Sequence, residues 1–600
     1  MSSSDKLNRS RRLVTALSSS LVLVGLISTG ALAQSGGPPG GPGGPDGPGG
    51  KKFSDIELMK RFDLNKDGRL DREERDAARP AAIEKKAESQ QGRKRRGGPP
   101  RDQGERATRP QNRPDAVRME ETDVEMFPDR ELYDRATLRT FFFEFPETDW
   151  HEEMVAFHGT DVEVPGTLRV DGELIGEVGI SYRGNTSFER PEKKSFGVSI
   201  DAYEDDLSLY GYNTLNLLNA NGDPSMMREV LFSNIASDHM PAPKANFVKV
   251  VVNGVYLGVY SNVQQLNKDF IEEHYDTRKG VRWKVPPDFT GGGALSDQGS
   301  GTSEYKLKYE LKTGSAREKD WKALVALCRV LKRTPKEKFE EVLPKYIDVE
   351  ETIRFLALDN IFMDQDGYYS RGSDYYIYKD PDDRFHFFHY DNNETFDPPR
   401  GGGPGGPGGP GGPDRFRDGV GGPDGPRPGG FGPPPEDQER RRPGLDRPRR
   451  GGGQARPGQE GADDGPPRGG GRRGGRGGAG RTSTVIRPLS LSDQPQTRPL
   501  IHAVLSVPAF RERYLEVYRQ IATEELQEDA FRARIDAYRT LISDAVAQDP
   551  FGPDQKKFLE SLDGTETSLT EIVSRRRKFL LEDESLTPDS DDEDDSSDNR

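Results

Sequence analysis

The feature that most limits how this chain can fold is a long low-complexity tract at residues 399–481. It is rich in Gly, Pro and Arg, in runs such as GGGPGGPGGPGGP and RGGGRRGGRGG, and has almost no aliphatic side chains. Such a segment cannot bury enough apolar surface to offset the entropy lost on ordering, so we expect it to be disordered. A folded domain must therefore be assembled from the sequence on both sides, at 130–398 and 482–582, with the tract as an insertion.

Composition supports the same interpretation. Hydrophobic and charged residues each make up 32% of the chain, with 69 Gly and 46 Pro, whereas globular chains are close to half apolar. The net charge is −15 and residues 583–600 form an acidic tail, so a nucleic-acid partner is not expected and RNA binding by the RGG triplets is the weakest alternative. The single Cys328 excludes an intramolecular disulfide, and the helical spacing of WKALVALCRVL predicts that this thiol is buried.

Residues 1–33 have the pattern of a secretory signal peptide. A basic KLNRSRR precedes the apolar LVTALSSSLVLVGLISTGA, and Ala31-Leu32-Ala33 forms a small-x-small cleavage site before Gln34. An uncleaved membrane anchor is the alternative, but the interrupting serines and the cleavage site favour removal. No other stretch is apolar enough to span a bilayer. We therefore expect a secreted, periplasmic or cell-surface protein with no membrane span after cleavage.

An EF-hand pattern occupies residues 52–79, between a Gly/Pro linker at 34–51 and a charged, disordered linker at 80–125. In FDLNKDGRLDREE, Gly68 stands at the sharp turn of the twelve-residue loop 63–74. The calcium ligands expected from the loop are Asp63, Asn65, Asp67, Arg69 through its backbone carbonyl, Asp71 and Glu74. An acidic turn of chance composition is the alternative, although it would rarely place Gly and Glu correctly together. The pattern predicts a local Ca²⁺ site of modest affinity, separable from the main domain.

Short-range signals in the main segment predict strands followed by helices, an α+β arrangement. FVKVVVNGVYLGVY has β-forming residues on both sides of Asn253-Gly254, which predicts a hairpin. TLRVDGELIGEVGISYRG alternates apolar and polar residues and indicates further strands. DVEETIRFLALDNIF has Asp348 and Glu351 at capping-box spacing, which predicts a helix start. Helical periodicity returns from 487 to 581, and we expect these helices to pack back on the domain.

Several segments resemble, in the same order, motifs of the CotH family of spore-coat proteins, whose domain is an atypical protein kinase. They are ISYRGNTSFERPEKKSFGVSI, NTLNLLNANGDPSMMREVLF, FVKVVVNGVYLGVYSNVQQLNKDFI, DQDGYYSRGSDYYIYKDPDDRFHFFHYDNNETF, RPLIHAVLSVPAFRERYLEVY and SLTEIVSRRRKFL. The resemblance covers residues 130 to 581. It implies a CotH-like atypical kinase fold with a large disordered insertion, preceded by a small helical EF-hand unit.

The resemblance also implies a site for ATP with Mg²⁺ or Mn²⁺. Asp366 occupies the position of the catalytic aspartate, and Asp391 that of the metal-binding aspartate. The residues implied at the nucleotide and its metal are Lys193, Lys194, Arg183, Asp391 and Asp374. Each has a structural alternative, because lysines at strand ends are usually solvated, Asp-Gly is a common turn, and Asp391 could cap a loop.

Three positions depart from the family pattern. Asp374 replaces a metal-binding Asn, Asn393 replaces an Asp, and Gln264 stands where Glu is usual and would weaken an ion pair to a phosphate-binding lysine. Two functions therefore remain open. The first is an exported calcium-binding kinase that phosphorylates a surface or coat protein of unknown identity. The second is a non-catalytic cell-surface structural or binding protein that keeps the fold.

Overall fold

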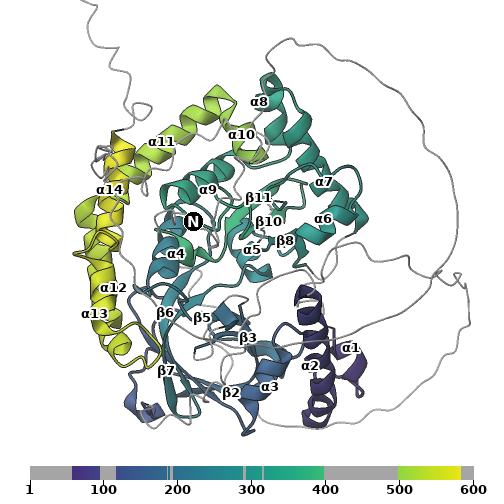
Figure 1. Cartoon of the computed structure of the whole chain (residues 1–600), viewed down its shortest axis with the longest axis vertical. Helices are drawn as coiled ribbons and strands as arrows, with labels where there is room; N and C mark the ends of the chain where they lie inside the picture. The colour runs from purple at the N-terminus through teal and green to yellow at the C-terminus, as the bar shows by residue number, and fades with distance from the viewer. Residues whose placement is uncertain are drawn as a thin grey trace, which may run out of the picture. The chain divides into compact units, whose positions relative to one another are not determined.

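The computed structural model describes residues 57–94, 117–184, 187–189, 193–287, 292–313, 317–396 and 498–582 (Figure 1). The expected signal peptide at 1–33, the linker at 34–51, the insertion at 399–481 and the acidic tail at 583–600 lie outside these residues. Among the residues that the structure does describe, no helix combines the length and apolarity needed to cross a bilayer.

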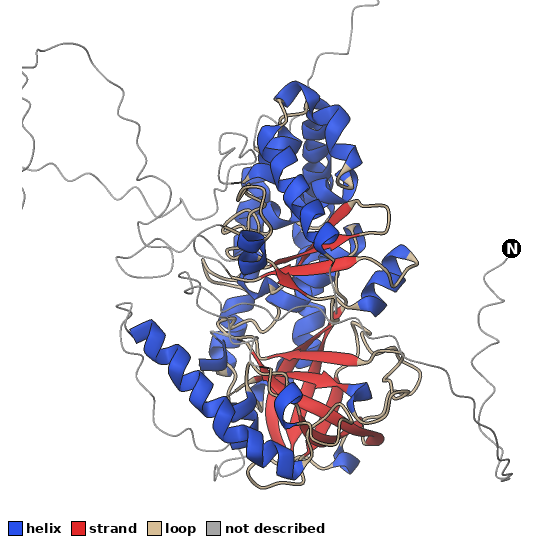
Figure 2. Ribbon diagram, turned by 90° about the vertical axis from the view of Figure 1, so that its right-hand side faces the viewer, coloured by secondary structure: helices blue, strands red, loops and turns tan. Residues whose placement is uncertain are grey.

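The first part of the main domain is a closed β-barrel with strand order β1-β2-β3-β4-β5-β7-β6 (Figure 2). Its strands are β1 Arg139–Glu144, β2 Val164–Val170, β3 Glu173–Arg183, β4 Ser195–Ser199, β5 Thr214–Leu218, β6 Ala245–Val252 and β7 Val255–Val263. Neighbouring strands pair antiparallel except β1 and β6, which pair in parallel and close the barrel. The barrel agrees with the expected mixed class, but the sequence did not predict its closure.

The predicted hairpin and the alternating strands are confirmed. Asn253 and Gly254 connect β6 to β7, and both have positive φ angles, of 48° and 74°, as a type I′ turn requires. The Asn253 Oδ1 atom also accepts a hydrogen bond from the Phe145 backbone N–H at 2.8 Å, so the turn is tied to the chain that leaves β1.

The second part of the domain is a smaller sheet of order β11-β10-β8-β9, surrounded by helices. Its strands are β8 Val281–Val285, β9 Glu310–Leu311, β10 Tyr375–Lys379 and β11 Phe385–His389. The helices are α4 Arg228–His239, α5 Lys268–Tyr275, α6 Ser303–Lys308, α7 Glu318–Arg333, α8 Phe339–Val342 and α9 Val349–Ile361. Asp348 caps α9 by accepting from the Glu351 N–H at 2.9 Å, as the sequence predicts.

The helices that follow the insertion pack against this second part, which confirms the expected return of the chain. They are α10 Pro499–Leu505, α11 Pro508–Glu524, α12 Glu528–Ala547, α13 Gln555–Leu562 and α14 Leu569–Leu581. Their apolar faces share one core with α4, α7 and α9, and this core also buries Cys328 completely. Polar contacts reinforce the packing, because Asn234 donates to the Tyr538 hydroxyl at 2.8 Å and Arg576 donates to the Asn360 Oδ1 atom at 2.8 Å.

The N-terminal helical unit, residues 57–94, contains α1 Met59–Phe62 and α2 Arg72–Lys94. The helix that follows the loop contains Pro80 and continues to Lys94, beyond the expected end of the unit at residue 79, so the linker predicted for 80–125 begins later than expected. The physical reason is that Ala78 and Ala82, on either side of the proline, are buried in the same apolar cluster as the barrel. That packing sustains the helix despite the missing backbone donor.

The unit is also less separable than the sequence suggested. α2 lies against α3 (Trp150–Phe157), where Arg75 Nε is 2.7 Å from a carboxylate oxygen of the fully buried Glu153. Leu58 and Leu70 are buried beside barrel side chains, and the Leu58 N–H donates to Asp161 at 2.7 Å. The unit and the barrel therefore share an interface with a buried ion pair.

Candidate functional site

Three of the predicted aspartates lie around one edge of the small sheet. β10 and β11 pair antiparallel with Tyr375 opposite His389, so Asp374, just before β10, and Asp391, just after β11, are brought to the same edge. Both have left-handed backbone conformations, with φ angles of 51° and 63°, and so turn the chain sharply at that edge. Asp374 is buried, whereas Asp391 stays exposed to solvent.

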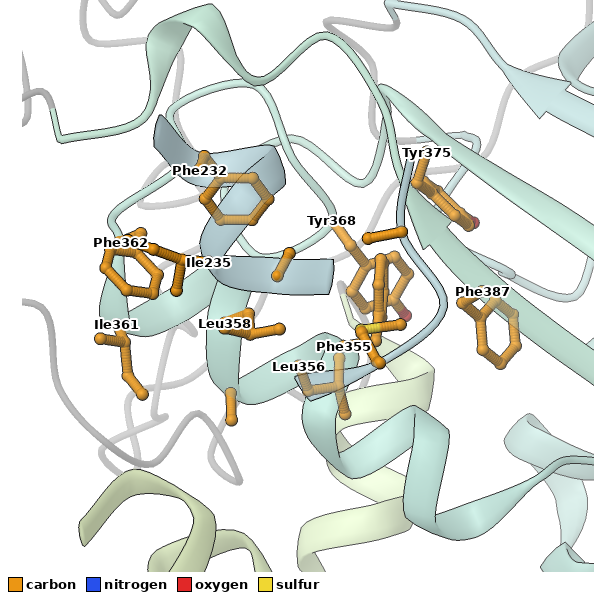
Figure 3. Close-up of a cluster of buried hydrophobic side chains, with 14 of the residues drawn as sticks. Phe232, Ile235, Phe355, Leu356, Leu358, Ile361, Phe362, Tyr368, Tyr375 and Phe387 are labelled. Carbon is orange, nitrogen blue, oxygen red and sulfur yellow. The ribbon is translucent and has the colours of Figure 1, made fainter. Parts of the chain in front are cut away.

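Asp366 reaches the same place from the loop after α9. That loop is hydrogen-bonded to the segment after β11, because the Gln365 N–H donates to the Glu394 carbonyl at 3.3 Å and the Phe396 N–H to the Phe362 carbonyl at 2.7 Å. The core beneath is aromatic: Tyr368 packs 5.3 Å from Tyr375 between ring centroids (Figure 3). The loop after α9 and the segment after β11 are thus joined to each other by hydrogen bonds, and they lie next to packed aromatic side chains.

The acidic side chains raise one another's pKa. Burial, followed by the charge of Asp391, raises the pKa of Asp374 well above its usual range. Burial and Glu394 raise the pKa of Asp366 to about 8, against the opposing effect of Arg371, which forms an ion pair with Asp366. Although the residue as a whole is exposed, burial of its carboxyl group, followed by the charge of Glu394, raises the pKa of Asp391 against the opposing charges of Lys284 and Arg183. Crowded carboxylates of this kind favour a proton or a cation between them.

Cations that the sequence did not single out complete the cluster. Lys284, on β8, lies 3.9 Å from the Tyr390 ring centroid. Burial works to lower its pKa, but Tyr390, Tyr376 and Asp391 outweigh burial, and the pKa is raised overall. The predicted Arg183, at the end of β3, approaches the same tyrosine, with its Nη2 atom 3.5 Å from the Tyr390 hydroxyl.

Of the three cations that the sequence predicts at the nucleotide, Arg183 is the one near Asp391. The positive charge of Arg183 acts to lower the pKa of Asp391. No local motif marked Lys284 or Arg371, because each joins the cluster through strand pairing or a turn. The alternation in VRWKV could only have placed Lys284 on one face of a strand.

Lys193 occupies a different environment. Its Nζ atom is 2.6 Å from Asp549, which follows α12, and 2.8 Å from the Val259 carbonyl. Both side chains are buried, and burial lowers the pKa of Lys193 despite Asp549. Gly258 leaves the room for this contact, since a Cβ there would approach the Asp549 carboxylate to 2.1 Å. Lys193 therefore joins the barrel to the C-terminal helices, and its role at the phosphates stays a prediction.

Lys194, the residue just before β4, has different partners from Lys193. Its ammonium donates to the Phe188 carbonyl and lies 4.3 Å from the centre of the Phe188 ring. The same ring stacks on His158 at the end of α3, with centroids 3.5 Å apart. The β3–β4 connection is thereby attached to α3.

The remaining departures from the family pattern have local partners. Gln264 donates to Glu273 at 3.0 Å and accepts from the Lys244 N–H at 3.1 Å. Asn393 donates to the Asn221 carbonyl at 3.1 Å.

A buried glutamate on α4, Glu229, also lies beside this cluster, and no motif in the sequence marks it. Asn392 donates to Glu229 at 3.3 Å, and burial together with Asp391 raises the pKa of Glu229 to about 8. A cavity of about 550 Å³ lies where the loop that follows β5 meets the loop that follows α12. Its lining includes Lys193, Asn219, Asn221, Asp223, Met226 and Phe551.

The predicted calcium loop has the turns that its sequence implies. Gly68 has a φ of +85° with open space around it, and Asp63 accepts from the Lys66 and Gly68 N–H groups at 2.6 and 3.1 Å. Glu74 reaches across the loop to accept from the Leu64 and Asp71 N–H groups at 2.8 and 3.1 Å.

The other predicted ligands close the loop through short-range bonds. Asn65 accepts from the Asp67 N–H at 2.9 Å, Asp67 from the Arg69 N–H at 3.0 Å, and Asp71 from the Glu74 N–H at 2.9 Å. Within the described ranges, no three or more His, Cys, Asp or Glu side chains are gathered closely enough to hold a metal ion. The donor types fit calcium, while the carboxylates are engaged with backbone donors.

Comparison with known families assigns the class of the chain. The model of the CotH kinase protein family matches residues 180–419 and 463–580, which is more than half of the sequence. The chain therefore belongs to the CotH kinase protein family. Among curated proteins, it is similar to the inner spore coat protein H of Bacillus subtilis (strain 168), with 27% identity over 199 residues. The match covers 33% of this chain and 53% of that relative, so the chain spans about half the length of the relative it matches.

Proposed function

We propose that the domain transfers the γ-phosphoryl group of a Mg²⁺- or Mn²⁺-bound nucleotide to a hydroxyl group of a protein. The observation that carries this proposal is the convergence of Asp366, Asp374 and Asp391, from three separate segments, beside Lys284 and Arg183. Phosphoryl transfer requires carboxylates for the metal, cations for the phosphates and an acceptor for the hydroxyl proton. These side chains supply each of the three.

Each residue has a distinct role in this proposal. A divalent ion bound with the nucleotide would neutralise the phosphate charge, and Asp391 and Asp374 would hold it. Arg183 and Lys284 would bind the phosphate oxygens. Asp366 would orient the acceptor hydroxyl and take its proton.

The test is nucleotide binding by titration calorimetry with ATP and Mn²⁺. Asp391→Asn keeps the size of the side chain but removes its charge, so metal-dependent binding should weaken at least about tenfold. Asp382→Asn is the matched control, because Asp382 is an exposed turn residue on the other end of β11. Equal binding by both variants would remove Asp391 from the site.

We further propose that the loop 63–74 binds Ca²⁺ and that the protein is exported to the cell surface or a coat. The calcium proposal is supported by the twelve-residue pattern and by the turn at Gly68. Export is supported by the signal-like residues 1–33, and a coat location by the name of the curated relative. A protein substrate on the same surface follows from that location.

A second candidate function is a binding protein without catalysis. It is favoured by the way Lys193 is held by Asp549, and by the cations Arg371 and Lys284 that already balance Asp366 and Asp391. In that case ATP with Mn²⁺ would bind neither the wild-type chain nor Asp391→Asn, and replacing Asp391 would mainly change stability.

A further inference from the structure

The chain that emerges from the insertion contacts the loop of Asp366. Arg498, the residue before α10, donates through Nε to the Tyr369 carbonyl at 2.9 Å and through Nη2 to the Ser370 carbonyl. Two residues further on, the Leu500 N–H donates to the Tyr368 hydroxyl at 3.0 Å. The start of α10 thus holds the consecutive residues 368–370.

These three residues belong to a tight turn that begins beside Asp366. The Arg371 and Gly372 N–H groups donate to the Gly367 and Tyr368 carbonyls, both at 3.0 Å, and so close the turn. The turn brings Arg371 back onto Asp366 as an ion pair. A change in the turn would therefore move the Arg371 guanidinium away from the Asp366 carboxylate with which it pairs.

The turn has little room to adopt another shape. At Gly367 a Cβ would approach the Asp359 Oδ1 atom to 2.1 Å and the Asp364 Oδ2 atom to 2.6 Å. Asp359 also accepts from the Tyr369 N–H at 2.5 Å, so the backbone is held from the α9 side as well. Arg498 supplies the restraint from the opposite side, through two carbonyl oxygens.

We propose that Arg498 is a positioning residue for phosphoryl transfer, acting through the turn 367–372 on Arg371 and Asp366. The planar guanidinium places two N–H donors at a fixed separation, which matches two successive carbonyls. A lysine at this position could also reach a carbonyl, but its donors share one nitrogen on a flexible stem and lack the fixed separation of the guanidinium donors, so it would hold the two carbonyls less rigidly. This inference rests on the proposed function of Asp366. It means that a residue after the insertion, Arg498, helps to position a site whose aspartates all precede the insertion.

The proposal predicts a split between kcat and KM. In the full-length chain, with labelled ATP, Mn²⁺ and dephosphorylated casein as the acceptor, Arg498→Ala should lower kcat at least about tenfold, since misplacing one catalytic group costs this much or more. The KM for ATP should stay within about twofold, because the Arg498 hydrogen bonds described above are to the carbonyls of the turn and not to the proposed metal ligands. Arg498→Lys should fall between wild type and Arg498→Ala.

The control is Arg513→Ala, in the same C-terminal segment. Arg513 pairs with Glu350 on α9 at 2.8 Å but does not contact the turn, so its replacement should leave kcat unchanged. A kcat for Arg498→Ala equal to that of Arg513→Ala would overturn the proposal.

Hydrogen exchange separates this inference from the proposed function. The backbone amides of Arg371 and Gly372 should exchange faster in Arg498→Ala and Arg498→Lys than in Arg513→Ala, with the core of α9 unchanged. If the wild-type chain transfers no phosphate, the proposed function fails. The exchange rates would still show whether Arg498 restrains the turn 367–372. Equal exchange of these two amides in all variants would exclude it.

Discussion

The contact between the N-terminal helical unit and α3 contains one buried ion pair, beside the more exposed pairs that Arg72 and Arg79 form with Asp149. The Arg75 side chain is 4% exposed and the Glu153 side chain is fully buried, with 2.7 Å between Nε and the carboxylate. Arg75 also donates to the Leu70 carbonyl at 2.9 Å, so its position is fixed from two sides. Glu153→Gln removes the negative charge and leaves the guanidinium buried without a counter-ion.

Breaking a buried pair in this way costs about 3–5 kcal/mol. Because each 1.4 kcal/mol is a factor of ten, the equilibrium for separation of α2 from α3 should shift by about two to three and a half orders of magnitude. The assay is native-state hydrogen exchange of the α2 amides at residues 72–87, which should accelerate by that factor if the unit opens locally.

Glu147→Gln provides the control for this prediction. Glu147 is 40% exposed and lies 3.9 Å from Arg72, so its loss should cost no more than about 1 kcal/mol. A double variant, Arg75→Leu with Glu153→Leu, should recover part of the loss, because it leaves no unpaired buried charge. Exchange in Glu153→Gln that matches Glu147→Gln would refute the buried-pair argument.

Three further predictions concern other parts of the chain. Glu74→Gln removes one oxygen of a bidentate ligand and should weaken calcium binding, measured by calorimetry, by about tenfold or more, whereas an unchanged affinity would speak against the loop. Replacing residues 399–481 by a short Gly/Ser linker should change the melting temperature by no more than about 2 °C, and a large fall would mean that the tract packs. Burial lowers the pKa of His158 from its usual 6.5 to about 4. Between these two pH values the imidazole is therefore mostly neutral in the folded state and mostly protonated in the unfolded state. The wild type should therefore lose stability relative to His158→Gln as the pH falls from 6.5 towards 4, by at most about 1.4 kcal/mol per pH unit, while parallel denaturation curves at all pH values would contradict this.

Features set by neighbouring residues could be predicted from the sequence. The Asn253-Gly254 turn and the Asp348 cap each depend on a few adjacent residues, and both have the expected geometry. The same holds for the return of the helices after the insertion, because their apolar periodicity requires a core to cover.

Features set by distant pairing could not be predicted. Barrel closure depends on β1 meeting β6 in parallel, and nothing in RTFFFE specifies that partner. Arg72, Arg75 and Arg79 in α2 share one face at helical spacing, yet only the structure shows that this face meets Asp149 and Glu153.

In the candidate site, too, some residues could be placed from the sequence, whereas contacts between distant segments could not. Asp366, Asp374 and Asp391 could be placed by family resemblance, because each lies in a recognisable segment. The ion pair of Lys193 with Asp549 could not, since the partner comes from beyond the insertion and is accommodated only because residue 258 is a glycine.

The most direct test of the central claim is phosphate transfer itself. Purified full-length chain, shown to be folded, is incubated with labelled ATP and Mn²⁺, with dephosphorylated casein as the acceptor, and compared with Asp366→Asn. We expect incorporation of label by the wild type and a loss of at least about a hundredfold in Asp366→Asn, with nucleotide binding retained, because Asp366 acts on the acceptor hydroxyl. Equal incorporation by both proteins would contradict the role of Asp366, and a wild-type chain that binds no nucleotide would contradict the proposed kinase.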